Sequence, residues 1–204
     1  MKSVIIATKN AGKAKEFESL FHSKGYKVLT LLDYDQAPDV EETGSTFEEN
    51  AILKAEAISR ELGQLVIADD SGLIVDVLDG EPGVYSARYA GEDKNDAANT
   101  EKVLRKLQDV PMSERTARFY CALALASPYQ ETITVSGTVE GMIARKPTGE
   151  NGFGYDPVFF IPEKGKTMAE LEPSEKNAIS HRAKALKALE SQLDEFIRRE
   201  EGNI

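Results

Sequence analysis

The sequence contains little cysteine and no long run of apolar residues. Its single cysteine, Cys121, excludes a disulfide within the chain, and its apolar surroundings indicate a buried thiol rather than a reactive one. No apolar run approaches the roughly 18 residues that a membrane-spanning helix needs. The opening segment, MKSVIIATKN, has too short an apolar core for a secretory signal. These features predict a cytoplasmic protein without a membrane partner.

Positive charge is also scarce in this chain. Lysine and arginine together number 25, against 35 aspartates and glutamates, so the formal net charge is -10. A protein that binds nucleic acid non-specifically needs a basic surface, so the composition predicts no nucleic-acid partner. Any anionic ligand must then be bound by a few local cations, which makes the position of each lysine and arginine informative.

Several sequence patterns of known catalytic sites are missing. The chain has no Walker pattern G-x-x-x-x-G-K-[ST], no CxxC or HxxxH spacing of the kind found in zinc sites, and no apparent Ser–His–Asp pattern. Internal repeats, low-complexity segments and long linkers are absent too. A length of 204 residues suits one α/β domain covering residues 1–204.

A candidate anion-binding loop follows the first predicted strand, Ser3–Ala7. The loop is short and polar, contains a glycine and a lysine, and leads into a predicted helix. This layout directs backbone N–H groups and a helix N-terminus toward an anion. The same residues are compatible with an ordinary strand–helix turn. The loop consists of Thr8, Lys9, Asn10, Ala11, Gly12 and Lys13.

The segment Gly63–Leu78 contains two apolar, β-branched runs on either side of Asp69-Asp70-Ser71-Gly72. This pattern predicts two buried strands joined by an acidic turn. Adjacent carboxylates repel each other, and burial adds a desolvation cost. A divalent cation would offset both effects because it prefers oxygen ligands. An ordinary turn formed by aspartate side chains explains the same residues without a metal.

The segment Thr46–Leu62 has the pattern of an amphipathic helix. Thr46 and Glu49 fit a capping box, and apolar residues recur at helical spacing behind them. Lys54 lies on another face, either as a solvent-exposed lysine or within reach of a ligand. Just before this helix, the acidic pair Glu41-Glu42 forms either a solvated loop or a second source of carboxylates beside Asp69-Asp70.

Two further stretches combine polar or aromatic residues with permissive backbone. The glycine-rich loop Lys146–Pro157 contains Phe153, Tyr155 and Asp156. The two aromatic rings either stack on a planar base or pack where the next strand begins. A final helix is predicted from Ser174, as N-cap, to about Arg199. Basic side chains fit poorly near the positive end of a helix dipole, so an anionic or polar ligand would account for them. A solvated first turn is the alternative for these residues, which are Lys176, His181 and Arg182.

Together these features form a complementary set: an anion-binding loop, a carboxylate cluster, local cations and an aromatic loop. A nucleoside triphosphate bound with Mg²⁺ needs all four. The sequence resembles the inosine triphosphate pyrophosphatase family, which hydrolyses non-canonical purine nucleoside triphosphates and so cleanses the nucleotide pool. The resemblance covers nearly the whole chain, and Lys9 replaces a glycine common in the family. The matching motifs are ATKNAGK (7–13), EETGSTFEENAILKA (41–55), ADDSGL (68–73), GEPGVYSARYAGED (80–93), FGYDPVF (153–159) and EKNAISHR (175–182).

The resemblance implies an elongated α/β fold with two lobes, a long bent mixed β-sheet flanked by helices, and an active cleft between the lobes. It implies a homodimer that uses Mg²⁺ to convert ITP, dITP and XTP into the monophosphate and pyrophosphate. By the same resemblance, Asp70 is the catalytic carboxylate and binds the metal with Glu42 or its neighbour Glu41. The residues implied to bind the phosphates are Thr8, Lys9, Asn10, Ala11, Gly12, Lys13 and Lys54, and Ser71 is implied to contact the substrate. Those implied to shape the base and sugar pocket are Phe153, Gly154, Tyr155 and Asp156, and those implied to close over the base are Lys176, His181 and Arg182.

Two other classes of function fit parts of the pattern. A regulatory protein could bind the triphosphate without hydrolysing it, but it would need no acid such as Asp70 to activate water. A metal-dependent phosphomonoesterase acting on small metabolites would release orthophosphate and would need no base pocket. Identification of the reaction products separates these classes.

Overall fold

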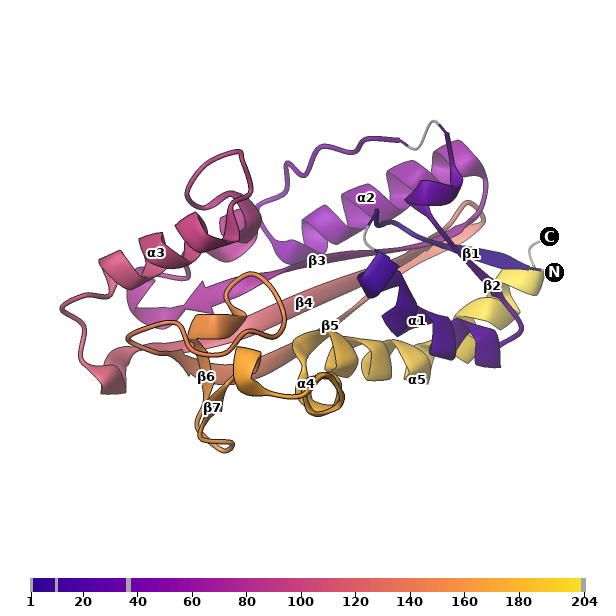
Figure 1. The fold of residues 1–204 in the computed structure, drawn as a ribbon. Coiled ribbons are helices and arrows are strands. Elements are labelled where there is room, and N and C mark those ends of the chain that lie inside the picture. The colour runs from indigo at the N-terminus through magenta and orange to yellow at the C-terminus, as the bar shows by residue number, and fades with distance from the viewer. Residues whose placement is uncertain (1, 10, 36–37, 203–204) are drawn as a thin grey trace. The chain divides into compact units, whose positions relative to one another are not determined.

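The computed structural model describes residues 2–9, 11–35 and 38–202. It contains a seven-stranded sheet with the order β2-β1-β3-β4-β5-β6-β7, flanked by helices (Figure 1). This mixed arrangement confirms the predicted α/β class. The strands are β1 Ser3–Ile6, β2 Lys27–Thr30, β3 Leu65–Val75, β4 Thr116–Ser127, β5 Gln130–Ile143, β6 Phe159–Ile161 and β7 Lys166–Thr167, and the α-helices are α1 Ala11–Ser23, α2 Phe47–Leu62, α3 Asp96–Lys106, α4 Pro173–Ile179 and α5 His181–Gly202.

The chain forms two compact units. The first unit comprises residues 1–70, 121–137 and 184–204, and the second comprises residues 71–120 and 138–183. Each unit has its own cluster of buried apolar side chains. Strands β3, β4 and β5 and helix α5 contribute residues to both units, so neither unit is a continuous piece of sequence.

The first unit is built on parallel strands. β1 pairs in parallel with both β2 and β3, in a register that places Ile6 opposite Ile67. Successive side chains of a strand point to opposite faces, so both faces of β1 need a cover of helices. Figure 1 shows α2 on one face of these strands and α1 with α5 on the other. The buried cluster includes Val4, Ile6, Phe17, Phe21, Leu65, Ile67, Leu123, Leu189 and Leu193.

The second unit is built on antiparallel strands. β5 pairs with β6, and β6 with β7, both antiparallel. The guanidinium of Arg115 is buried here, and its Nη1 donates to the carbonyl oxygen of Ala144 at 2.9 Å and to that of Ile143 at 3.4 Å. A buried charge needs such partners to offset its lost hydration. The apolar cluster includes Leu73, Val75, Val103, Leu107, Phe119, Val139, Phe159 and Met168.

The predicted acidic turn at Asp69-Asp70-Ser71-Gly72 is wrong. β3 is one continuous strand of 11 residues, and the aspartates lie in its middle. Aspartate and glycine are depleted in strands, which is why the local pattern indicated a turn. The pairing of β3 with β1 ends at Ile67, but β3 continues through the aspartates as a strand of the sheet, next to β4.

The single helix predicted from Ser174 is also wrong. Two helices cover this segment, because Ser180 has extended backbone with ψ of 154° and separates α4 from α5. The hydroxyl of Ser180 accepts a hydrogen bond from the N–H of Ala183 at 3.1 Å, so this serine caps α5. Ser174 is not the N-cap of α4, because Pro173 already occupies the first helical turn and Glu172 is the cap.

Other predictions are confirmed. α2 begins after Thr46, with both hydrogen bonds of the capping box to Glu49 present. Residues 121–126 of β4 are all buried, as expected for a strand covered on both faces, and Cys121 is among them. Among the helices that the structure describes, none has the length and apolar character needed to cross a membrane.

Candidate functional site

The predicted phosphate loop and the predicted acids meet at one edge of the first unit. β1 and β3 are parallel neighbours, and the N–H of Ala7 donates to the carbonyl oxygen of Ile67 at 2.8 Å. Thr8 follows directly, where β1 has ended, whereas β3 continues to Val75, so Asp69 and Asp70 lie on β3 just past the carboxyl end of its neighbour β1. In parallel sheets, ligands bind beyond the carboxyl ends of the strands.

The loop after β1 leads directly into a helix, as predicted. Thr8 is half-buried, Lys9 is exposed, and α1 begins at Ala11. Asn10 lies outside the described residues. Of Ala11, Gly12 and Lys13 the structure describes the helical backbone alone. The first turn of α1 carries no acidic side chain, which leaves the positive end of this helix suited to an anion.

Side chains of helix α2 contact both the aspartates of β3 and the loop that precedes the helix. The Nδ2 of Asn50 donates to the Oδ2 of Asp70 at 3.0 Å. One turn further, the Nζ of Lys54 donates to the backbone oxygen of Asp69 at 3.1 Å and forms an ion pair with the carboxylate of Glu42. The side chain of Lys54 is only 17% exposed, so the interpretation of a solvent-exposed helix lysine is wrong.

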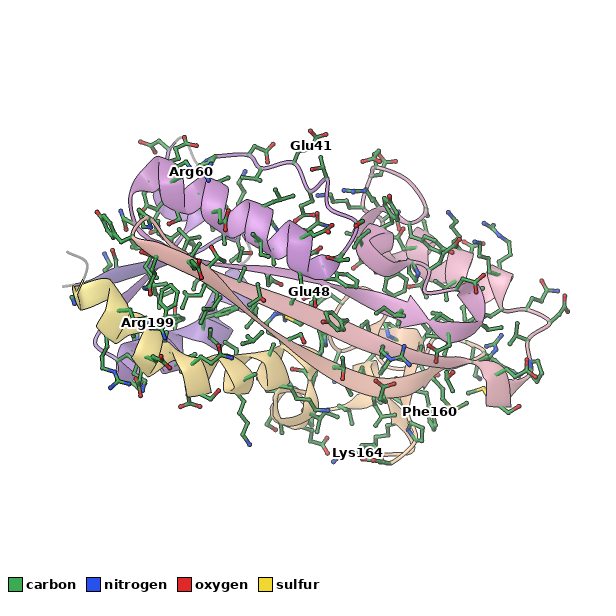
Figure 2. The ribbon with its side chains drawn as sticks, turned by 180° about the vertical axis from the view of Figure 1, so that it is seen from behind. Glu41, Glu48, Arg60, Phe160, Lys164 and Arg199 are labelled. Carbon is green, nitrogen blue, oxygen red and sulfur yellow. The ribbon has the colours of Figure 1, made fainter. Side chains whose placement is uncertain are left out.

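The two neighbouring glutamates have different surroundings in the structure. The carboxylate of Glu42 is the one that pairs with Lys54, and it is close enough to Asp70 to affect its pKa. Glu41 is exposed, and Figure 2 shows its side chain pointing away from α2. We therefore include Glu42, and not Glu41, in the acidic cluster with Asp69 and Asp70.

The acidic cluster alters the protonation of Asp70. Burial raises the pKa of this carboxyl to about 6, from 3.8. The hydrogen bond from Asn50 and the positive charge of Lys54 lower the pKa, whereas repulsion from Glu42 and Asp69 raises it further. Asp70 is therefore a stronger base than an ordinary aspartate and still mostly ionised above pH 7.

The cluster has the chemistry of a magnesium site without a complete set of protein ligands. Within the described residues there is no group of three or more His, Cys, Asp or Glu side chains arranged to hold a metal ion. Asp70 and Glu42 nevertheless offer oxygen donors whose mutual repulsion a cation would reduce. Mg²⁺ commonly binds to one or two carboxylates, with water and substrate phosphates completing its coordination. The residues present fit this ion.

A second cluster lies in the second unit, at the predicted aromatic loop. The carboxylate of Asp156 is only 4% exposed; it accepts a hydrogen bond from the N–H of Phe153 at 3.0 Å and forms an ion pair with Lys176. The Nζ of Lys176 also lies 4.9 Å from the centroid of the Phe153 ring. Phe153 is 57% exposed, so its ring is available to stack on a planar group.

The other residues predicted around the base have more buried positions. Tyr155 is in the core, where its hydroxyl donates to the carbonyl oxygen of Ser86 at 2.7 Å and burial raises its pKa. The N–H of Gly154 donates to Asp96 at 2.8 Å. His181 stacks on Phe119 with ring centroids 5.1 Å apart, and Arg182 is buried. Phe153 is therefore the aromatic residue of the loop that faces solvent. Ser71 is half-buried on β3, directly after Asp70.

Sequence reasoning missed two residues of these clusters. Asn50 has no predicted role, although an asparagine inside a helical pattern is itself a signal, because its amide competes with the backbone. Gly152 was not singled out. A Cβ at this position would lie 2.0 Å from the Oδ2 of Asp156 and 3.0 Å from the Nζ of Lys176. Its importance is visible only in three dimensions.

The chain is similar to known proteins over nearly its whole length. A model described as the Ham1 family matches residues 4–192. The chain belongs to the Ham1 family. It is 64% identical over 197 residues to the dITP/XTP pyrophosphatase of Geobacillus kaustophilus (strain HTA426), covering 97% of each chain. It is 61% identical over 195 residues to the dITP/XTP pyrophosphatase of Bacillus licheniformis, covering 96% of this chain and 100% of the relative.

A solved Ham1 structure has the same fold. The Ham1 protein of Staphylococcus aureus superposes with a TM-score of 0.89 at 50% identity, covering 95% of this chain and 98% of that one. The Ham1 match confirms the family predicted from the six motifs and the mixed α/β class. All residues named in both clusters lie inside the matched range, from Thr8 to Arg182.

The raised pKa of Asp70 predicts a pH-dependent cost to the stability of this Ham1 protein. The folded state disfavours the ionised carboxyl, so the contribution of Asp70 to stability is most favourable below the unfolded pKa of 3.8 and is lost as pH rises through the folded pKa of about 6. In buffer without divalent cations, Asp70→Asn removes this cost. We expect it to raise the free energy of unfolding by about 1–3 kcal/mol at pH 7.5, with the gain vanishing toward pH 4.

Urea unfolding of both proteins across this pH range measures the effect. Asp109→Asn, at an exposed aspartate, is the matched control and should follow the wild-type curve. A gain in the free energy of unfolding that is constant with pH, or a loss at pH 7.5, would contradict a raised pKa at Asp70.

The close approach at Gly152 predicts a steric effect that Gly154 lacks. Both glycines have positive φ, 80° and 61°, so alanine strains the backbone at either position. Only at Gly152 does the new Cβ collide with the Asp156–Lys176 pair; at Gly154 nothing lies within 4 Å. Gly152→Ala should therefore lose about 1–3 kcal/mol more stability than Gly154→Ala, measured by the urea midpoint. Equal losses would mean that the pair shifts without cost.

Proposed function

We propose that this Ham1 chain is an enzyme that hydrolyses dITP, XTP and ITP to the nucleoside monophosphate and pyrophosphate. Two relatives at 64% and 61% identity are named dITP/XTP pyrophosphatases. The observation that carries the proposal is the Asp70 carboxylate, which Asn50 holds on β3 just past the end of β1, where the Thr8–Lys13 loop begins. A base beside an anion-binding loop suits attack of water on a phosphoanhydride.

In this proposal Asp70 orients a water molecule and accepts its proton as the water attacks the α-phosphorus. In the absence of a metal ion the pKa of this carboxyl is about 6, so the group is ionised at neutral pH and can accept a proton or a cation. The N–H groups of the loop after β1 and of the first turn of α1 bind the phosphates. Lys13 and Lys54 add positive charge for the same anions.

The carboxylates of Asp70 and Glu42 would hold Mg²⁺, which supplies charge neutralisation for the phosphates and the departing pyrophosphate. The relatives' names support hydrolysis with release of pyrophosphate, and the proposed metal rests on the donor set of the cluster. The ammonium of Lys54 partly neutralises Glu42 and so limits the net negative charge that the substrate must approach.

Base recognition is assigned to the second cluster. The exposed ring of Phe153 provides a stacking face, and Lys176, His181 and Arg182 provide donors. A donor facing position 6 favours the oxo group of hypoxanthine and xanthine over the amino group of adenine. An unpaired buried polar group costs on the order of 1–3 kcal/mol, which is enough for discrimination. A second donor facing position 2, for which we choose Arg182, would disfavour the amino group of guanine.

The two alternative functions have less support. A regulatory protein that binds the triphosphate without hydrolysis needs no buried carboxylate such as Asp70, whose ionisation lowers the stability of the folded state. A phosphomonoesterase has no use for the exposed aromatic ring beside Lys176. The proposal includes a homodimer, which the family resemblance implies, and a cytoplasmic location, which the composition predicts. Sedimentation of the purified chain would test the first, and cell fractionation would test the second.

The proposal predicts the identity of the first products. With dITP and Mg²⁺, the chain should release dIMP and pyrophosphate, with a solvent ¹⁸O label on the monophosphate when the reaction is run in labelled water. Attack at the α-phosphorus with pyrophosphate as leaving group requires this pattern. Chromatography with mass spectrometry identifies both products.

The variant Asp70→Asn tests whether the acidic cluster catalyses this reaction. It should lower kcat by at least about 10²-fold, because a general base is removed while the fold is kept. Initial release of dIDP and orthophosphate would refute the pyrophosphatase mechanism. Tight nucleotide binding without any turnover would support the regulatory class instead.

A further inference from the structure

The side-chain amide of Asn50 has a fixed orientation. Its Oδ1 accepts a hydrogen bond from the backbone N–H of Gly44 at 2.7 Å, and its Nδ2 donates to Asp70 at 3.0 Å. A backbone N–H can only donate, so the atom facing Gly44 must be the amide oxygen. The amide nitrogen must then face Asp70. Asn50 is 1% exposed, so water does not compete for these contacts.

The loop that fixes Asn50 is itself anchored on the first turn of α2. The N–H of Ser45 donates to the carboxylate of Glu49 at 2.7 Å, and the N–H of Thr46 donates to the same carboxylate at 3.3 Å. A Cβ at Gly44 would lie 2.7 Å from both the Oδ1 of Asn50 and the Cβ of Glu49. The backbone therefore approaches Asn50 as closely as only glycine permits.

We propose that Asn50 is the positioning residue for the Asp70 carboxylate. The anchored loop sets the orientation of its amide, and the amide sets the orientation of the carboxylate through Oδ2. Asn50 acts through Asp70 and does not itself touch the reacting atoms. The inference rests on the proposed function, because it assigns to Asp70 a chemical task that depends on orientation. Partners of this kind, one step removed from the reacting group, commonly change activity about 10- to 100-fold when altered.

A merely structural role for Asn50 makes a different prediction. If its task were to tie the loop before α2 to the helix, the bond to Gly44 alone would matter. The substitution Asn50→Asp separates the two roles. It keeps the shape and the acceptor that faces Gly44, but replaces the donor that faces Asp70 with a second acceptor. Asn50→Ala removes both contacts and serves as the second variant.

The experiment measures kcat and KM for dITP, together with the thermal unfolding midpoint, for wild type and both variants at pH 8. We expect Asn50→Asp and Asn50→Ala to lower kcat about 10- to 100-fold, while KM changes less than about threefold. A loss confined to kcat indicates that binding survives and that the orientation of the carboxylate is what has been lost. Each kinetic assay is run well below the unfolding midpoint of its variant.

Asn99 provides a matched control in helix α3. It is also buried, its Oδ1 accepts from the N–H of Ala90 at 2.6 Å, and its Nδ2 donates to the carbonyl oxygen of Ala87 at 3.0 Å. It thus ties a loop to a helix without contacting the acidic cluster. Asn99→Asp should lower the unfolding midpoint while kcat stays within about twofold of wild type.

The outcomes distinguish the inference from the proposed function. Wild-type release of pyrophosphate, with kcat of Asn50→Asp within about twofold of wild type, overturns the positioning role and leaves the function in place. An equal loss of kcat in Asn50→Asp and Asn99→Asp also overturns it, since any buried asparagine would then suffice. A wild-type chain that releases no pyrophosphate overturns the proposed function, and the inference with it.

Discussion

The burial of the Asp70 carboxylate beside other carboxylates is the constraint on which the site depends. Asp69 and Asp70 are adjacent in a strand, and Glu42 is brought toward them by the loop before α2. Such a cluster is unfavourable without a partner, because like charges repel and burial removes hydration. The helix α2 supplies the compensation through Asn50 and Lys54, one turn apart on the same face. The remaining cost appears as the raised pKa of Asp70.

The two clusters of the protein use opposite electrostatic designs. In the second unit, Asp156 is neutralised by Lys176 and by the N–H of Phe153, so the pair is a finished structure that fixes a loop. In the first unit, Asn50 and Lys54 contact the acidic cluster, and the pKa of Asp70 is nevertheless raised. A neutralised pair suits shape recognition of a base, whereas a carboxylate with a raised pKa suits a chemical step.

Local patterns predicted the elements that depend on local interactions. The start of α2 followed from the capping residues Thr46 and Glu49, and the burial of β4 followed from its apolar residues on both faces. The turn predicted at Asp69-Asp70 was wrong because β3 continues through these residues as one strand of the sheet, which outweighs their turn preference. The break at Ser180 was missed because a serine cap inside a helical pattern resembles an ordinary polar position.

The site was predictable in its parts, and its assembly was not. Asp70, Lys54 and the Thr8–Lys13 loop could be named from the motifs, whereas the sequence left Glu41 and Glu42 as equal candidates. The choice of Glu42 depends on which neighbour faces Lys54 in the folded chain. The role of Asn50 depends on the register of α2 against β3 and on the backbone of Gly44, which no local pattern encodes.

The most direct test of this account is a Mg²⁺ titration followed by thermal unfolding of the purified chain without substrate. If the carboxylates repel each other as described, Mg²⁺ should raise the unfolding midpoint of wild type progressively, because a ligand that binds the folded state stabilises it. The same titration of Asp70→Asn should give a much smaller rise, and NaCl of matched ionic strength should not reproduce the wild-type effect. An equal rise in wild type and Asp70→Asn, or an equal rise with NaCl, would contradict a cation site at the acidic cluster.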